Sequence, residues 1–246
     1  MYKKLLLKDK KVVVTGGSKG LGRAVVLACA KEGAQVAFTY AHDDAAATKT
    51  EQLVGSVGFK YKISATSLVE NIKMAQELKE RWGGIDILIN NAGRSEFLPM
   101  ALMEESDWRT TLDLNLTGAF ITVKAFLPLM VAQKKGHVMN VGSLAGVRIL
   151  AAPIDYSASK AGLKGFSEAL AKEVGRYNIQ VNCFAPGILD GGVAMGIPEN
   201  KIRDYIDQLS IKRIATFDEA ARALAFFVSD KNSYMSGATL IFDGGL

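Results

Sequence analysis

The chain has 246 residues, of which 49% are hydrophobic, 22% charged and 8% aromatic, and its formal net charge is +5. These fractions are ordinary for a globular protein and exclude an intrinsically disordered chain. Two cysteines, two histidines and no Cys-x-x-Cys pair argue against a disulfide scaffold and a metal site. The mild positive charge has no basic runs, so nucleic acid is not an expected partner, whereas an acidic protein or a phosphate-bearing ligand is.

No membrane span and no signal peptide are expected. The most apolar long stretch, residues 119–132, contains Lys124 and Pro128 and is shorter than the roughly 20 residues that a span requires. The N-terminal residues include only three leucines, where a signal peptide needs about 7–15 apolar residues. A cytoplasmic, reducing compartment is the expected location.

Short β-rich runs alternate with longer helical patterns along the whole chain. The expected strands cover residues 11–15, 35–40, 59–63, 86–90, 137–141, 180–184 and 239–242. The expected helices cover residues 21–32, 43–54, 68–82, 105–132, 156–177 and 217–229. Several strands are continuous Val, Ile, Leu and Phe runs, which is typical of a sheet covered on both faces. Residues 1–246 are therefore predicted to form a single α/β domain, a Rossmann-type, doubly wound, parallel seven-stranded sheet with helices on both faces.

A glycine-rich turn follows the first expected strand. It contains Gly16, Gly20 and Gly22 in the pattern Gly-x3-Gly-x-Gly, and a helix rich in Ala and Val comes next. Glycines allow a tight turn and let the backbone approach a phosphate at the positive N-terminus of a helix. The spacing differs from the Gly-x-Gly-x-x-Gly of other dinucleotide sites, and a plain strand-to-helix turn is the alternative interpretation.

The chain resembles the short-chain dehydrogenase/reductase family. The family's Thr-Gly-x3-Gly-x-Gly motif is matched from Thr15 to Gly22, and its Asn-Asn-Ala-Gly motif is matched by residues 90–93. The similarity extends to the closing Asp-Gly-Gly at residues 243–245. This resemblance implies a nicotinamide dinucleotide cofactor. The residues expected to contact it are Gly16, Ser18, Lys19, Gly20, Leu21, Gly22, Tyr40, Asn91, Ala92, Gly93, Tyr156, Lys160, Pro186, Gly187 and Ile188.

The end of the second strand indicates which cofactor is preferred. An acidic residue there would hold the ribose hydroxyls and repel a 2′-phosphate, but the chain has Tyr40. Lys19 matches the basic residue of NADP-preferring members, and a cation there can pair with the 2′-phosphate. Asp43 and Asp44 are interpreted as N-cap residues of the next helix. NADPH is therefore expected, with NADH as the less favoured alternative.

Two positions depart from the family pattern. The family usually has Asp-Val after the third strand, with the Asp meeting the adenine amine, and this chain has Ser64 and Ala65. The family often has a Thr that contacts the nicotinamide carboxamide, and this chain has Gly191. Both departures concern the affinity for the cofactor rather than the chemistry.

A serine, a tyrosine and a lysine are spaced as a catalytic group. Tyr156 and Lys160 lie four residues apart at the start of an expected helix, so they share one face. Ser143 follows the preceding strand, at the edge where open α/β sheets bind ligands. A carbonyl that accepts a hydride needs a proton at its oxygen, and a neighbouring Lys⁺ is expected to lower the tyrosine pKa from near 10. The serine hydroxyl can hydrogen-bond the same oxygen.

The family resemblance implies matching roles for these residues. Tyr156 is the implied acid/base, Lys160 also binds the nicotinamide ribose, and Ser143 polarises the carbonyl. Asn115 matches a fourth member of the set, which holds a water beside the lysine. Asp155, next to the tyrosine, is expected to be solvated.

The substrate is indicated by the branch that the chain resembles most, the 3-oxoacyl-(acyl carrier protein) reductases, which reduce a β-keto thioester on an acidic carrier. Lys134 matches one basic carrier-docking position and Arg176 lies one residue from a second, with solvated helix-end charges as the alternative. Residues 188–213 correspond to the substrate loop, glycine-rich at first and then amphipathic and helical, which suits a lid. The family also implies a homotetramer formed through the two long helices.

Two other functions stay open. One is an NAD(P)-dependent dehydrogenase of a small alcohol, sugar or steroid, and the other is a non-catalytic nucleotide-binding protein on the same fold. Enoyl reduction is disfavoured, because that branch has six residues between its Tyr and Lys rather than three.

Overall fold

Seven parallel strands form one sheet in the order β3-β2-β1-β4-β5-β6-β7. The computed structural model describes residues 5–192 and 196–246. The strands are β1 (Lys11–Val14), β2 (Gln35–Tyr40), β3 (Gly58–Lys62), β4 (Ile87–Asn90), β5 (Gly136–Val141), β6 (Ile179–Pro186) and β7 (Thr239–Phe242). The prediction of a single, doubly wound α/β domain with a parallel seven-stranded sheet is confirmed, and the strand ends differ from expectation by at most two residues.

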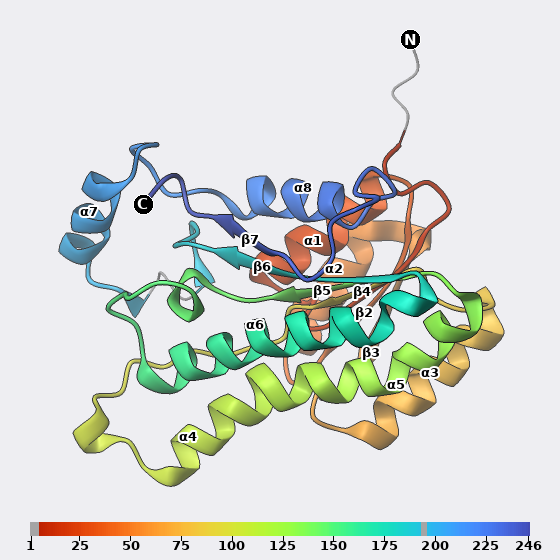
Figure 1. The fold of residues 1–246 in the computed structure, drawn as a ribbon, viewed down its shortest axis with the longest axis horizontal. Coiled ribbons are helices and arrows are strands. Elements are labelled where there is room, and N and C mark those ends of the chain that lie inside the picture. The colour runs from red at the N-terminus through yellow and green to blue at the C-terminus, as the bar shows by residue number, and fades with distance from the viewer. Residues whose placement is uncertain (1–4, 193–195) are drawn as a thin grey trace.

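Helices cover both faces of the sheet (Figure 1). The helices are α1 (Gly20–Lys31), α2 (Asp44–Val54), α3 (Leu68–Trp82), α4 (Glu105–Leu112), α5 (Gly118–Gln133), α6 (Ile154–Val174), α7 (Glu199–Gln208) and α8 (Phe217–Phe227). Side chains of α1, α2 and α8 pack on one face, and those of α3, α5 and α6 pack on the other. α7 lies at the end of the molecule toward which β6 and β7 point (Figure 1).

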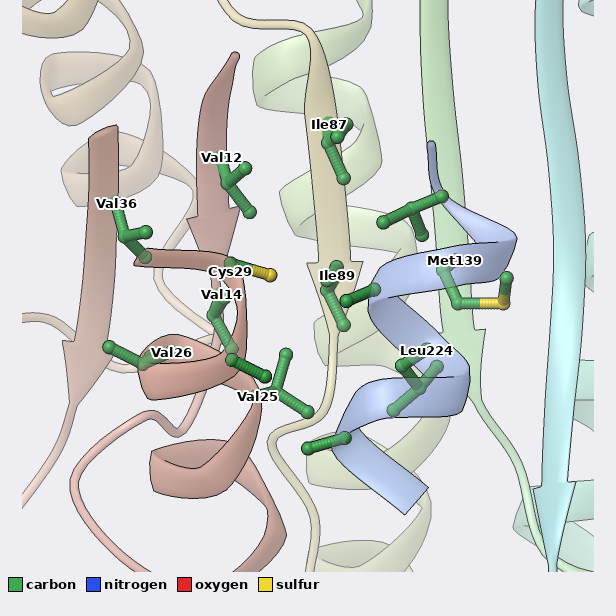
Figure 2. Packing of buried hydrophobic residues seen from close by; sticks show 14 of the residues in the cluster. Val12, Val14, Val25, Val26, Cys29, Val36, Ile87, Ile89, Met139 and Leu224 are labelled. Carbon is green, nitrogen blue, oxygen red and sulfur yellow. The ribbon is translucent and has the colours of Figure 1, made fainter. Parts of the chain in front are cut away.

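Each central strand buries both of its faces, since successive side chains point to opposite sides. In β1, Val12 and Val14 belong to the core under α1 and α8, whereas Val13 belongs to the core on the other face. Figure 2 shows the first of these layers, where Cys29 of α1 and Leu224 of α8 lie over the strands. Full burial of such a side chain contributes about 1.5–3 kcal/mol, which explains the continuous apolar runs in the sequence.

The helix expected over residues 105–132 is continuous but contains one wide turn. α4 passes into a π-helical turn, Asp113–Thr117, which leads into α5. In this turn the N–H of Gly118 donates to the carbonyl of Asp113, five residues earlier. Such turns occur frequently at functional sites, and this one contains Asn115.

The same helix has the composition of a core helix. Over Glu105–Gln133 it is long and apolar enough to cross a membrane by length and composition alone, with a mean hydropathy of 1.6 in its most apolar window. Within the fold, 44% of that window is buried. Val123, Phe126 and Met130 of α5 pack in the core that α3 and α6 share, so burial against the sheet accounts for these apolar residues.

α6 begins two residues before the expected helix and ends in a tighter turn. It starts at Ile154 after Pro153, ends at Val174 and is followed by the 3₁₀ turn Gly175–Tyr177. Asp155 consequently lies in the first helical turn, where it is 3% exposed and accepts the N–H of Tyr156 at 2.8 Å. The expectation that Asp155 is solvated is wrong, because the unpaired N–H groups of a helix N-terminus attract a carboxylate.

A buried polar network joins the sheet to the two helices that carry the site. Asn90 of β4 donates to Asn140 of β5 at 2.8 Å and accepts from Thr122 of α5 at 2.6 Å. Asn140 in turn donates to Ser167 of α6 at 2.8 Å. Satisfied buried networks specify one arrangement, because any displacement leaves a polar group unpaired. The network therefore fixes α5 and α6 relative to the ends of β4 and β5.

His137 predicts a loss of stability in acid. The side chain is 5% exposed and lies 3.3 Å from the amide of Asn182. Burial lowers the pKa of His137 to about 4, against the opposing charge of Asp230, whereas the unfolded value is about 6.5. The unfolded chain therefore binds a proton between these values, and the folded state loses stability as the pH falls through that window. From pH 7.5 to pH 5 we expect a loss of about 2 kcal/mol.

Urea unfolding at the two pH values, compared with the variant His137→Gln, measures this contribution. At pH 7.5 the imidazole is almost entirely neutral in both states, so the variant should change the pH dependence only on the acid side. An equal loss of stability in wild type and variant between pH 7.5 and 5 would show that His137 is not the group responsible.

Candidate active site

The site lies at the carboxyl ends of the central strands, where the strand order reverses between β1 and β4. Connections that leave neighbouring strands in opposite directions open a crevice at this point, and ligands of α/β sheets bind there. The candidate residues that follow these strand ends are Thr15 to Gly22 after β1, Asn91 to Gly93 after β4, Ser143 after β5, and Gly187 and Ile188 after β6.

The two sequence motifs form one hydrogen-bonded unit. The Thr15 hydroxyl accepts the backbone N–H groups of Asn91 and Ala92, both at 3.0 Å. The side-chain amide of Asn91 donates back to the carbonyls of Thr15 and Gly16, both at 3.1 Å. These bonds hold the glycine turn against the end of β4, so each motif positions the other.

The glycine turn fits a dinucleotide phosphate. Gly16 and Gly20 have φ angles of +67° and +57°, a region that glycine adopts without strain. A Cβ at Gly22 would lie 2.1 Å from the Gly16 carbonyl oxygen, so only glycine lets α1 approach the turn. The N-cap of α1, Lys19, makes no side-chain capping bond to the described first turn. Backbone N–H groups at a helix N-terminus of this kind bind phosphate.

Ser18 shapes the same turn through its carbonyl. It accepts the Arg23 side chain at 3.0 Å and the Thr50 hydroxyl at 2.9 Å. Arg23 also donates to Thr50 at 2.8 Å. The glycine turn is therefore hydrogen-bonded to α2 through Thr50.

The end of β2 is arranged differently from expectation. Asp43 is the N-cap of α2 and accepts the N–H of Ala46 at 2.8 Å, as predicted. Asp44 is not a cap, because it accepts the Tyr40 hydroxyl at 2.9 Å and the Lys62 ammonium at 2.7 Å. Tyr40 is buried, and its hydroxyl donates its hydrogen bond to Asp44. Lys19 remains 73% exposed, with its ammonium 3.8 Å from Asp43.

The four expected catalytic residues come together. The Lys160 ammonium donates to the Val141 carbonyl at 2.7 Å and lies 5.6 Å from the centre of the Tyr156 ring. The side chain of Ser143 lies close enough to the Tyr156 phenol to lower its pKa. A Cβ at Gly93 would lie 3.6 Å from the Lys160 ammonium and 3.0 Å from the side-chain oxygen of Asn115. The end of the second motif therefore packs directly against the lysine and the asparagine.

Burial dominates the electrostatics of the site. It raises the pKa of Tyr156, and Ser143 acts in the opposite direction. It lowers the pKa of Lys160 to about 8, against the effect of Cys183. The pKa of Tyr156 therefore lies above its usual value rather than below it as expected, because desolvation of the phenolate outweighs the lowering effect of Ser143. Tyr156 is consequently a neutral phenol at pH 7, able to donate its proton.

Asn115 is held by backbone and side-chain partners at once. Its oxygen accepts the N–H of Arg94 at 2.8 Å, and its amide donates to the Arg94 carbonyl at 2.9 Å and to the Ser159 hydroxyl at 3.0 Å. Ser159 donates to the carbonyl of Tyr156 at 2.7 Å. Sequence reasoning did not single out Ser159, although a hydroxyl three residues after the tyrosine can bond back along the helix.

The expected substrate segment, residues 188–213, is anchored at both ends. Leu189 pairs with Ala215, and the N–H of Asp190 donates to the Ala215 carbonyl at 2.9 Å. Its predicted helical part is α7; residues 193–195 lie outside the described residues. Gly191 has a φ of +121°, and a Cβ there would lie 2.8 Å from the Phe217 ring. The ring fills the space that a side chain at position 191 would need.

The two expected carrier-docking residues lie away from the site. Lys134 ends α5 and Arg176 follows α6, at the ends of these helices opposite to Asn115 and Tyr156 (Figure 1). Arg176 comes 20 residues after Tyr156, which corresponds to about 30 Å along a helix. The structure therefore does not bring these residues to the crevice of the same chain.

Gly22→Ala tests the glycine turn as the phosphate site. The added methyl group must push α1 away from the Gly16 carbonyl, so we expect at least about a tenfold loss of affinity for the dinucleotide. Gly165→Ala is the matched control, because a Cβ placed there meets no described atom within 4 Å apart from its chain neighbours and the backbone of its own helix. Calorimetric titration of both variants with NADPH measures the effect, and equal affinities would show that the phosphates bind elsewhere.

Comparison with known proteins agrees with this geometry. Residues 16–246 match a family model described as Enoyl-(Acyl carrier protein) reductase. The 3-oxoacyl-[acyl-carrier-protein] reductase FabG of Chlamydia muridarum is 32% identical over 244 residues, which cover 98% of both chains. FabG of Escherichia coli is 31% identical over 237 residues, 96% of this chain and 97% of that protein.

The fold also matches a solved structure. The crystal structure of gox2181 has a TM-score of 0.91 and 29% identity, and the match covers 98% of this chain and 96% of that one. The family model spans nearly the whole chain, and the FabG relatives exceed 30% identity at nearly full coverage. The chain belongs to the short-chain dehydrogenase/reductase family of nicotinamide-dependent oxidoreductases.

Proposed function

We propose that the protein is an NADPH-dependent 3-oxoacyl-(acyl carrier protein) reductase. The observation that carries the proposal is the convergence of Ser143, Tyr156 and Lys160 beside the glycine turn. The Ser143 side chain lies close enough to the Tyr156 phenol to influence its pKa, and the Lys160 ammonium lies over the phenol ring, 5.6 Å from its centre. Two hydroxyl groups at one point suit the oxygen of a ketone, which gains negative charge during reduction.

The names of the relatives support a ketone rather than an enoyl substrate. The family model carries the name of an enoyl reductase, whereas the FabG relatives are named for 3-oxoacyl reduction. In this chain Lys160 lies one helical turn from Tyr156 and packs against it, in the three-residue spacing that favours ketone reduction.

The residues of the site divide the chemistry among them. When bound, the reduced nicotinamide supplies the hydride to the carbonyl carbon. Ser143 hydrogen-bonds the carbonyl oxygen, and the neutral phenol of Tyr156 donates its proton to that oxygen. Lys160, mostly protonated at pH 7 with a pKa of about 8, stabilises the phenolate that remains. Asn115 keeps Arg94 and the start of α6 in place through its three hydrogen bonds.

The carrier protein and the oligomer are proposed together. Lys134 and Arg176 are about 30 Å along their helices from the catalytic residues of the same chain. A carrier docked there can deliver its acyl group only to a neighbouring copy. The proposal of an acidic carrier bound at these residues therefore depends on the homotetramer that the family resemblance implies, and a cytoplasmic location is part of the same proposal.

Reduction of acetoacetyl thioesters tests the proposed reaction. We expect loss of NADPH absorbance with a free thioester and a faster loss with the carrier-bound form. Tyr156→Phe should lower kcat by about a hundredfold or more, since it removes the proton donor, while the affinity for NADPH stays close to that of wild type.

Each result of this assay separates a different part of the proposal. Near-wild-type turnover of Tyr156→Phe would show that another group is the acid. No reduction of either thioester would overturn the proposed substrate, and a panel of small alcohols, sugars and steroids would then distinguish a dehydrogenase from a non-catalytic nucleotide-binding protein.

Lys19→Asp tests the cofactor preference. The substitution places a carboxylate beside Asp43, which is 3.8 Å from the Lys19 ammonium, where the 2′-phosphate of NADPH is proposed to bind. Replacing attraction by repulsion should shift the ratio of kcat/KM for NADPH and NADH about tenfold to a hundredfold toward NADH. Lys31→Asp, an equal change in charge at the other end of α1, is the control. An unchanged ratio in Lys19→Asp would remove the lysine from the cofactor pocket.

A further inference from the structure

The loop that carries the catalytic serine is anchored to the C-terminal end of the chain. Ser143 is the N-cap of a 3₁₀ turn, Leu144–Gly146, and the N–H of Arg148 donates to the Leu144 carbonyl at 2.8 Å. The Arg148 guanidinium contacts the Asp243 carboxylate at 3.3 Å and donates to the carbonyl of Leu246. The Asp243 side chain is only 10% exposed, whereas that of Arg148 is 41% exposed, so the carboxylate is buried and the guanidinium covers it from the solvent side.

The C-terminal residues are also bonded to the exit of α7. The carbonyls of Gly244 and Gly245 accept the N–H groups of Ile211 and Ser210 at 2.9 and 3.1 Å. Both glycines have positive φ angles, +71° and +82°, which a side chain would strain. The free oxygen of the Asp243 carboxylate accepts the N–H of Gly245 at 2.9 Å. The turn is therefore closed on one side by α7 and on the other by Arg148.

α7 is bonded to the end of β6 as well. The Tyr205 hydroxyl accepts the N–H of Ile188 at 3.3 Å, and a Cβ at Gly187 would lie 2.2 Å from that hydroxyl oxygen. The N–H of Gly187 donates to the carbonyl of Phe242, directly before Asp243, at 2.9 Å. The helix, the strand end and the C-terminal residues thus form one closed set of contacts. Figure 1 shows the C-terminus beside α7 at this end of the molecule.

We propose that residues 243–246 act as a strap that couples the substrate segment to the serine loop, with Arg148 and Asp243 as positioning residues for Ser143. The inference rests on the proposed function of Ser143. When α7 is seated on Ile188, its exit holds Gly244 and Gly245, and these hold the carboxylate that fixes Arg148. The serine is then held where it meets the carbonyl oxygen. Coupling of this kind is reciprocal. A substitution that loosens the serine loop should therefore loosen α7, and a substitution that loosens α7 should loosen the serine loop.

Hydrogen exchange of single variants tests the coupling directly. Arg148→Gln and Asp243→Asn each remove the ion pair from one side; Asn keeps the size of Asp, and Gln keeps a polar but shorter side chain at position 148. We expect each to raise the exchange rate about tenfold in both residues 144–153 and residues 199–211. The double variant should add little to either single one, since both act on one interaction. Arg109→Gln, which breaks the exposed pair of Arg109 and Glu105 on α4, is the matched control and should change neither segment.

The proposal is overturned if Arg148→Gln speeds exchange in residues 144–153 alone, because the strap then transmits nothing to α7. If Asp243→Asn does not fold, removal of Leu246 is the milder variant. It takes away one acceptor of Arg148 and leaves the Asp243 carboxylate in place. It should raise exchange in both segments by a smaller factor, and exchange unchanged in both would also overturn the proposal.

Turnover separates positioning from general loss of structure. For Arg148→Gln we expect kcat to fall about tenfold, since the serine is displaced from the carbonyl oxygen, while the affinity for NADPH is unchanged. Arg148→Lys restores the charge and should recover part of kcat. The exchange experiment needs no substrate. If both segments respond but no thioester is reduced, the strap stands and the proposed substrate fails.

Discussion

The bonds between Thr15 and the backbone of Asn91 and Ala92 are the constraint on which the site depends. β1 and β4 send their chains in opposite directions, and without a link the two turns would have no common geometry. The threonine hydroxyl accepts two N–H groups that would otherwise be left unpaired near the core, which is costly in a folded protein. The same contact places Gly93 against Lys160 and Asn115. A bond between motifs 76 residues apart thus sets the distance from the phosphate turn to the catalytic group.

Burial then determines the charge states of Tyr156 and Lys160 before the reaction. The Lys160 ammonium is removed from water and compensated by a backbone carbonyl, while Tyr156 stays a phenol because desolvation penalises its anion. A tyrosine already ionised could not donate a proton. The arrangement favours an acid that is neutral before the reaction and stabilised as an anion after the proton has left.

The sequence predicts most features that depend on neighbouring residues, such as helix bounds, and few contacts between residues far apart in the chain. The bounds of α3 match the prediction because Ser67 caps its start and Gly83, at a φ of +79°, ends it. The π-helical turn at Asn115 could not be predicted, since no residue type marks it within an apolar helix. Asp44 bonds Tyr40 and Lys62 instead of capping α2, because strand pairing brings Lys62 to the end of β2. The same limit applies to Arg148 and Asp243, whose separation along the chain hides their contact.

The departure at position 191 shows how a local comparison can mislead. Compared with the family pattern, Gly191 is the loss of a threonine. In the structure it is one half of a packing pair, because the Phe217 ring lies where a side chain at 191 would stand. The same ring lies 3.8 Å from a Cβ position at Gly20 in the phosphate turn. A single aromatic side chain at the start of α8 therefore lies between the turn that would hold the pyrophosphate and the segment that would cover the substrate. A threonine at 191 would require the Phe217 ring to shift and would hold a φ of +121°, which strains any side chain.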